Sequence, residues 1–130
     1  MAELTMKKKR PKNLDLLTIK QPLPAVLSIL HRVSGAGLFL FLPVLLWLLQ
    51  SSLASPESFA MVKGLAGNIV VKVILLGLLW AYCHHFCAGI RYLLLDGHIG
   101  IEKEAARMTA KISFAVSLLA TVILGGLLLW

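Results

Sequence analysis

The sequence is poor in charged residues, and above all in acidic ones. Only 15% of its 130 residues are charged, and six Asp or Glu stand against thirteen Lys or Arg. No charged residue occurs between Val33 and Ser55, between Val73 and Ile90, or after Lys111. Hydrophobic residues make up 58% of the chain, which is far more than a soluble domain needs to fill one core. The composition therefore excludes an ordinary soluble domain and predicts an all-α membrane protein.

Three apolar windows are long enough to cross a bilayer. They cover roughly residues 30–49, 70–93 and 112–130, and each has about the 20 residues needed to span some 30 Å of hydrocarbon. No internal repeat or low-complexity segment is evident. Residues 1–130 are therefore predicted to form a single transmembrane anchor domain of three helices.

The N-terminal region lacks the features of a targeting signal. Its first 30 residues contain no apolar core of the secretory type, and they are short of the Ser and Arg typical of transit peptides. We therefore expect an uncleaved multi-pass protein of a bacterial inner (cytoplasmic) membrane. The segment from Leu14 to Leu27, which contains Pro22 and Pro24, is too polar to span and is predicted to approach the first helix along the cytoplasmic interface.

The basic residues predict the orientation in the membrane. Only Lys63 and Lys72 lie in or beside the connection between the first and second windows. All the others precede or open the first window or lie around the second connection: Lys7, Lys8, Lys9, Arg10, Lys12, Lys20, Arg32, Arg91, Lys103, Arg107 and Lys111. The positive-inside rule then places the N-terminus in the cytoplasm and the C-terminus outside. Because the basic N-terminal run lies beside a span and lacks interleaved aromatic residues, its expected partner is anionic lipid of the bilayer and not nucleic acid.

Two adjacent histidines, His84 and His85, interrupt the second window. Ionisable groups at membrane depth are costly and usually functional. Positions four apart share a helix face, and one such face carries Gly77, Ala81, His85 and Gly89. This wall of small residues would admit a flat macrocycle, and His84 is turned about 100° away, so His85 is the better candidate for a haem ligand. The same stripe would also suit close helix packing with a hydrogen-bonding histidine, and periodicity does not decide between the two.

The third window repeats this spacing without a possible haem ligand. Ser113, Ser117, Thr121 and Gly125 lie four apart, and here helix packing is the only expected role.

The chain has only two cysteines, Cys83 and Cys87, and both flank the histidines. They could share part of a helix face with His84, but a structural zinc site needs four ligands with tetrahedral access. Helical geometry also does not bring the two sulfurs into bonding position. We interpret both as small apolar fillers.

The start of the first window carries a second group of polar residues. Ser28 and Arg32 are four apart and share a face near the cytoplasmic interface, while His31 points to an adjoining side. Such donors could hold a quinone carbonyl or an anionic propionate, although Arg32 could equally extend to lipid phosphates. The predicted topology brings the start of this helix to the membrane half where His85 lies, as electron transfer between a quinone and a haem would require.

These residues match a known family. The segments Arg10-Pro-Lys-Asn-Leu-Asp-Leu16, Ser28-Ile-Leu-His-Arg-Val-Ser34 and His85-Phe-Cys-Ala-Gly-Ile-Arg91, with the following Asp96, resemble the cytochrome b subunit of succinate dehydrogenase, the larger membrane anchor of complex II. The specific signal is the combination of S-x-x-H-R-x-S with H-x-x-x-G-I-R, each at its expected place beside a span.

The resemblance implies a membrane-anchor subunit of a succinate:quinone oxidoreductase. With a second small anchor it would bind one shared haem b and hold the iron-sulfur and flavoprotein subunits, and electrons from succinate would pass to ubiquinone. The resemblance makes His85 an axial haem ligand, places His31 near the haem propionates and puts Ser28 and Arg32 in the quinone site. The second axial ligand would come from the partner anchor.

The chain contains no flavin-attachment, dicarboxylate-binding or iron-sulfur motif, so we do not expect it to oxidise succinate alone. Two other functions remain open at this point. One is a haem-free anchor for a peripheral enzyme, in which His85 only packs, and the other is a subunit that uses the buried histidine for proton translocation.

Overall fold

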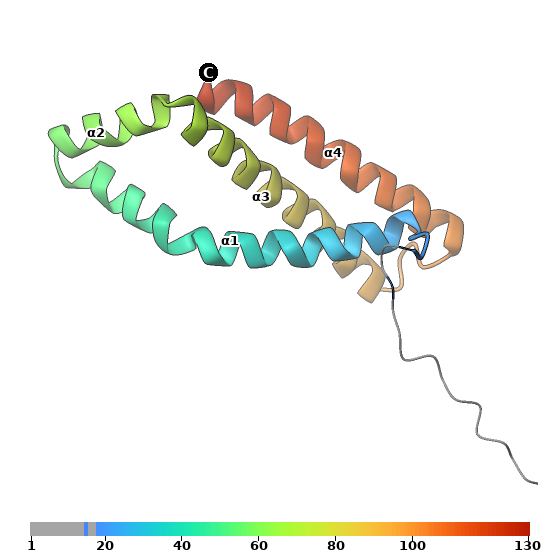
Figure 1. The fold of residues 1–130 in the computed structure, drawn as a ribbon. Coiled ribbons are helices and arrows are strands. Elements are labelled where there is room, and N and C mark those ends of the chain that lie inside the picture. Colours follow the sequence, from blue (N-terminus) through green and yellow to red (C-terminus); the bar gives the residue numbers. More distant parts are fainter. Residues whose placement is uncertain (1–14, 16–17) are drawn as a thin grey trace, which may run out of the picture.

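The computed structural model describes residue 15 and residues 18–130, which form four helices joined by short turns (Figure 1). The helices are α1 (Leu23–Ala54), α2 (Pro56–Gly67), α3 (Ile69–Asp96) and α4 (Lys103–Leu129). Three of them, α1, α3 and α4, are long and apolar enough to cross a membrane, and they contain the three apolar windows of the sequence. The predicted all-α fold with three membrane-crossing helices is confirmed, whereas its sidedness stays a prediction.

The first helix begins earlier than expected. The approach segment was predicted to reach Leu27, but α1 already starts at Leu23, with Pro24 in its first turn. Proline is tolerated there because the first N–H groups of a helix have no intrahelical partner. Residues 18–22 precede the helix as irregular chain. The rest of the predicted approach segment, apart from residue 15, and the basic run from Lys7 to Lys12 lie outside the described residues.

The connection between the first two spans is itself helical, which the sequence analysis did not predict. Ser55 caps α2, since its side chain accepts a hydrogen bond from the N–H of Ser58 while the Ser58 hydroxyl accepts one from the N–H of Ser55. Pro56 occupies the first helical position, where its fixed φ favours the helix. At this N-terminus the pKa of Glu57 is lowered by a hydrogen bond from its own backbone amide and by one involving the Ser55 side chain. The S-P-E-S sequence is a capping signal that could have revealed α2.

Helices α3 and α4 pack side by side in antiparallel orientation (Figure 1). The buried face of α4 consists of Ala110, Ser113, Ser117, Thr121 and Gly125, so the predicted packing role of this small-residue stripe is confirmed. The approach is close: a Cβ on Gly125 would lie 2.8 Å from Leu76 Cδ1. The Ser117 and Thr121 hydroxyls donate to carbonyl oxygens within α4, which satisfies them without water.

The tight turn between α3 and α4 needs two residues in the left-handed region. His98 has φ 61° and Gly100 has φ 74°, and glycine accepts such values without steric cost. At the far ends of the same two helices, Lys72 Nζ lies 4.8 Å from the centre of the Trp130 ring. The turn at one end and the Lys72–Trp130 contact at the other therefore hold α3 and α4 in register.

Helix α1 meets the others mainly through its first half. Its buried residues are Leu27 and Ser34, and Leu27 forms a small core with Ala88 of α3 and Ala110 of α4. Beyond this region α1 diverges from α3 towards α2 (Figure 1), and an apolar cavity of about 290 Å³ lies among the three long helices.

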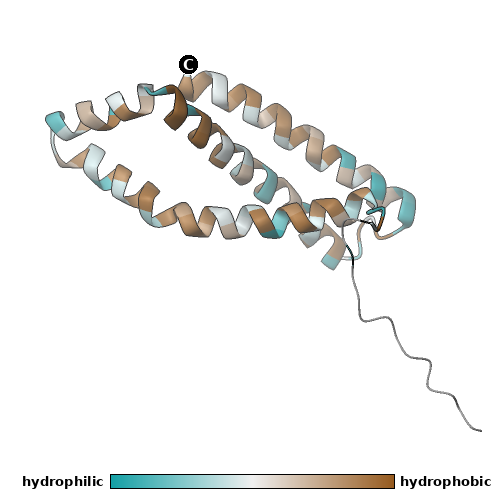
Figure 2. Cartoon of the chain, viewed as in Figure 1, coloured by the Kyte–Doolittle hydropathy of each residue, from teal (hydrophilic) through white to brown (hydrophobic). Residues whose placement is uncertain are grey.

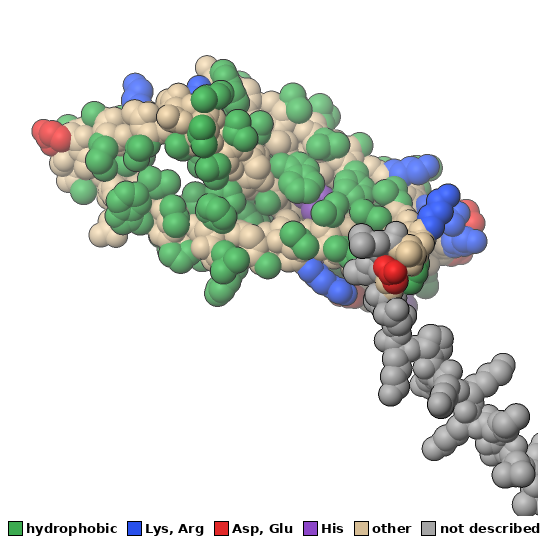
Figure 3. Space-filling view, in the orientation of Figure 1, with side chains coloured by type: hydrophobic (Ala, Val, Ile, Leu, Met, Phe, Trp, Pro, Cys, Tyr) green, Lys and Arg blue, Asp and Glu red, His purple; other side chains and the backbone are tan. Residues whose placement is uncertain are grey.

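Polar and apolar side chains are segregated along the molecule. Hydropathy is high along the middle of the long helices and low at the turns (Figure 2). Figure 3 shows basic side chains at the end where α1 begins and α3 turns into α4, and a broad band of hydrophobic side chains between the two ends. Such a band is what a helix bundle presents to lipid.

Candidate functional site

The candidate site lies near the start of α1, where this helix contacts α3. The imidazole rings of His31 and His85 stack, with their centroids 4.1 Å apart and their planes inclined by only 7°. His85 Nδ1 lies 3.0 Å from the His31 carbonyl oxygen and 3.3 Å from Ser34 Oγ. The structure thus brings together two histidines that are 54 positions apart and that the sequence placed at the same depth.

This hydrogen bonding fixes the chemistry of the His85 ring. A carbonyl oxygen can only accept, so Nδ1 carries the proton and donates it to the His31 carbonyl. In the neutral form of the ring, Nε2 is then the nitrogen with an in-plane lone pair. Within the described part of the chain Nε2 has no hydrogen-bond partner, and it is not among the enclosed, unpartnered nitrogens. The stacked His31 ring covers a face of the imidazole, whereas a metal would approach along its edge.

Glycine makes room for this arrangement. A Cβ on Gly35 of α1 would lie 2.7 Å from His85 Cε1 and 3.1 Å from Nδ1, which is closer than real Cβ contacts allow. A Cβ on Gly89 would meet His31 Nε2 at an ordinary 3.7 Å, and one on Gly77 would meet nothing within 4 Å. The wall around His85 is therefore tight towards α1 and open towards Gly77.

His84 lies in a different environment. Its side chain is fully buried, stacked on Trp80 at 5.3 Å and beside Phe114 at 5.2 Å. Its Nδ1 and Nε2 are both enclosed and make no hydrogen bond of standard geometry in the described part, although the Leu27 backbone is close enough to interact electrostatically. The two neighbouring histidines thus differ, because the His84 nitrogens are sealed in the bundle while the His85 Nε2 is accessible.

Ser28 lies about one turn before His31 on α1, and Arg32 follows His31 directly. Ser28 is half-buried and Arg32 is exposed, and the described residues provide neither side chain with a hydrogen bond or an ion pair. The ring of Tyr92 from α3 packs at 5.1 Å against the His31 ring. The serine and the arginine are therefore free to bind a ligand beside the histidine pair.

The polar residues at the end of α3 do not pair with each other. Arg91 is buried and donates from Nε to Thr109 Oγ1 at 3.0 Å and from Nη2 to the Ala106 carbonyl oxygen at 3.1 Å. Asp96, the last residue of α3, is exposed. The reason is that Arg91 lies on the face of α3 that packs against α4.

The cysteines next to the histidines are unpaired; Cys83 is buried and Cys87 is half-buried. Among the described residues no three His, Cys, Asp or Glu side chains are grouped so that they could hold a metal ion. A haem iron takes only one or two ligands from protein, so this observation does not bear on His85.

Sequence reasoning missed two residues of the site. Ser34 was read only as the last letter of the S-x-x-H-R-x-S motif, and Gly35 was not considered. Both follow His31 by one helical turn, and this spacing is the signal that could have placed them beside its ring.

Comparison with known proteins identifies the family. Residues 6–124 match the family described as succinate dehydrogenase/fumarate reductase transmembrane subunit. The chain belongs to this family. The resemblance seen in the sequence motifs is thereby confirmed.

Several similar proteins carry the name succinate dehydrogenase cytochrome b556 subunit. That of Coxiella burnetii is 39% identical over 126 residues, covering 96% of this chain and 100% of the relative. Those of Paracoccus denitrificans and Rickettsia prowazekii are 31% and 32% identical, covering 88% and 89% of this chain and 88% and 90% of the relatives. The name cytochrome b556 indicates that these relatives are haem b proteins of electron transport. As a transmembrane member of this succinate dehydrogenase/fumarate reductase family with three apolar helices, the chain is a bacterial inner-membrane protein.

Proposed function

We propose that this chain is the haem-binding cytochrome b subunit of a succinate:quinone oxidoreductase and that His85 Nε2 is an axial ligand of its haem b. The observation that carries the proposal is the hydrogen bond from His85 Nδ1–H to the His31 carbonyl oxygen. Histidines that bind a metal usually donate their other ring N–H to a carbonyl or a carboxylate, which fixes the tautomer and makes the free nitrogen more basic. His84 makes no hydrogen bond of standard geometry to a described residue and has no accessible nitrogen.

The residues around His85 fit a haem. A ligating imidazole must stand on a wall with little bulk, and the stripe from Gly77 to Gly89 supplies one that is open at Gly77. The haem would provide a one-electron relay between the iron-sulfur subunit and the quinone. His31, whose ring stacks on that of His85, would donate a hydrogen bond to a propionate. The second axial ligand would come from a second small membrane anchor that shares the haem.

Ser28 and Arg32 would form part of the site where ubiquinone is reduced. A quinone that accepts electrons gains negative charge on its carbonyl oxygens. The unpaired guanidinium of Arg32 can stabilise this charge, and the Ser28 hydroxyl can donate a hydrogen bond to the oxygen that is to be protonated. Both residues lie within one helical turn of His31, so the electron donor and the acceptor would be neighbours.

The other partners follow from what the chain lacks. Its sequence has no flavin-attachment or dicarboxylate-binding motif, so oxidation of succinate would take place on a flavoprotein subunit, and an iron-sulfur subunit would pass the electrons to the membrane. This chain would anchor both from the cytoplasmic side and complete the quinone site.

A matched pair of variants tests the haem proposal. His85→Leu and His84→Leu each remove one imidazole from adjacent positions of α3, and the complex is purified in both cases. We expect the dithionite-reduced minus oxidised spectrum to lose its b-type α-band in His85→Leu and to keep it in His84→Leu. Removing the unpartnered nitrogens of His84 is not expected to unfold the helix bundle, because both its ring nitrogens are already unsatisfied.

Two results would contradict the assignment. A parent complex without an α-band would exclude haem binding and favour a haem-free anchor. Loss of the band in His84→Leu with retention in His85→Leu would move the ligand to the other histidine.

A further inference from the structure

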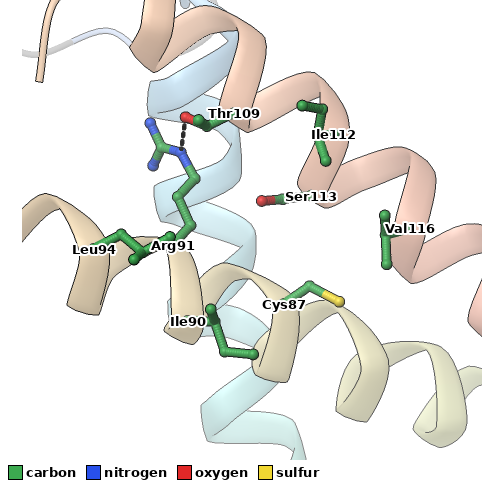
Figure 4. A pocket seen from close by; sticks show the side chains of 8 residues that line it. All are labelled: Cys87, Ile90, Arg91, Leu94, Thr109, Ile112, Ser113 and Val116. Carbon is green, nitrogen blue, oxygen red and sulfur yellow. Dashed lines mark hydrogen bonds between the residues drawn. The ribbon is translucent and has the colours of Figure 1, made fainter. Parts of the chain in front are cut away.

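A second polar feature, separate from the histidine pair, lies between α3 and α4. The two helices enclose a groove of about 250 Å³, shown in Figure 4. One end is polar, with Arg91 and Thr109, and Ser113 faces α3 a turn further along. The remaining walls are apolar and include Ile112 and Val116. The groove thus joins a cationic end to an apolar channel.

Arg91 is unusual for its burial and for the partners it has. Its side chain is only 5% exposed, and its hydrogen-bond acceptors, Thr109 Oγ1 and the Ala106 carbonyl, are both neutral. The guanidinium also lies 5.5 Å from the centre of the Tyr92 ring. Among residues 18–130 no carboxylate forms a salt bridge with it. A buried cation without an anion is strongly unfavourable, so an anion that entered the groove would be stabilised by Arg91.

Ser113 is a second polar residue of the groove. Its side chain is 8% exposed and lines the groove, and Figure 4 shows the hydroxyl directed from α4 towards α3. No hydrogen bond to this hydroxyl is present in the described part of the chain. A donor on the guanidinium and a nearby free hydroxyl are the pair that would bind an anionic oxygen.

The position of the groove selects the kind of anion. Ala106 belongs to the first turn of α4, so the guanidinium lies at the end of the span, where lipid phosphates are found. From Thr109 to Val116 the apolar channel extends towards the bilayer centre by about 10 Å, at 1.5 Å per helical residue. Its walls at Ile112 and Val116 are half-exposed and would face hydrocarbon. The His85 site opens towards α1, on another side of α3.

We infer that this groove binds one anionic phospholipid, with the phosphate held by Arg91 and Ser113 and part of an acyl chain between α3 and α4. Arginine suits this task because its planar fork of N–H donors matches phosphate oxygens and remains charged at any depth. The apolar walls exclude water from the ion pair and so strengthen it. The inference does not depend on haem or quinone binding.

Native mass spectrometry of the purified complex tests the inference, with phosphatidylglycerol and phosphatidylcholine of the same acyl chains as probes. We expect the parent to retain one phosphatidylglycerol more tightly than phosphatidylcholine by about tenfold or more, because the choline cation of phosphatidylcholine competes with Arg91 for the phosphate, whereas phosphatidylglycerol carries no cation. Arg91→Gln should abolish this preference. Arg107→Gln removes an exposed charge from the same end of α4 and should leave it unchanged.

A third variant separates the channel from the charge. Val116→Phe keeps Arg91 and fills the channel, and it should weaken retention of phosphatidylglycerol while the complex stays assembled. Equal retention of phosphatidylglycerol by the parent and Arg91→Gln would overturn the inference. Release of another subunit from Arg91→Gln, with the bound lipid unchanged, would also overturn it and would assign the anion to a carboxylate of the partner protein.

Discussion

Replacing Gly35 by alanine tests the geometry of the ligand most directly. The new Cβ would lie 2.7 Å from His85 Cε1, whereas carbon atoms pack best at about 3.5–4.0 Å. Because α1 and α3 are held together by the Leu27 core on one side of this contact, the ring and not the helix is expected to move, by about 1 Å. A retreat of that size takes Nδ1 out of hydrogen-bond range of the His31 carbonyl, now 3.0 Å away.

The expected magnitude follows from the role of that bond. Loss of a hydrogen bond that orients a metal-binding histidine costs about 10- to 100-fold in metal affinity, which corresponds to about 1.4–2.7 kcal/mol. Alanine also favours helix over glycine by about 1 kcal/mol, so the helix itself should not be weakened. Gly37→Ala has the same helix effect, but its Cβ would meet nothing within 4 Å, and this makes it the control.

The assay is haem retention by the purified complex, followed through the reduced minus oxidised spectrum during exposure to a haem-scavenging protein. Gly35→Ala should lose haem at least tenfold more readily than the parent, and Gly37→Ala should match the parent. Equal retention in all three proteins would refute the reasoning, because it would show that the His85 position does not depend on contact with α1.

Two further predictions concern packing and the quinone. Gly125→Leu should destabilise the complex by about 1–3 kcal/mol through overpacking against Leu76, which would lower its melting temperature. Gly126→Leu is the control, because the space around Gly126 is open and the melting temperature should not change. Equal melting temperatures for the two variants would contradict the close approach of α3 and α4. Arg32→Ala should reduce electron transfer to ubiquinone while succinate oxidation with an artificial dye continues, since it removes a charge that no described residue neutralises. Arg107→Ala is the control, and parallel loss of both activities in Arg32→Ala would point to failed assembly instead.

The features that the sequence could predict are those that depend on composition and helix phase. Charge-free windows revealed α1, α3 and α4, and spacing by four revealed the buried face of α4 from Ser113 to Gly125. Phase also separated His84 from His85, because adjacent residues lie about 100° apart on a helix. These features need no knowledge of how one helix is rotated against another.

The features that were missed depend on that rotation. The contact of Ser34 and Gly35 with His85 is set by the way α1 turns its face to α3, and only the packing around Leu27 fixes it. The partner of Arg91 could not be predicted either, because this side chain reaches across to Thr109 where α3 and α4 pack closely. Helix α2 was overlooked because it is too short and too polar to be interpreted as a span. Its N-terminal capping sequence, S-P-E-S, could nevertheless have predicted it.

The uneven burial of α1 has a consequence for how the protein can vary. Its buried residues, Leu27 and Ser34, lie in its first twelve residues, in the part that carries Ser28, His31 and Arg32. Further along, side chains such as Phe39, Leu46 and Leu53 are exposed and need only be compatible with an apolar surrounding. One helix thus places two different demands on its side chains: substitutions near its start would disturb the packing against α3, whereas its second half needs only apolar residues of whatever shape its surroundings accept.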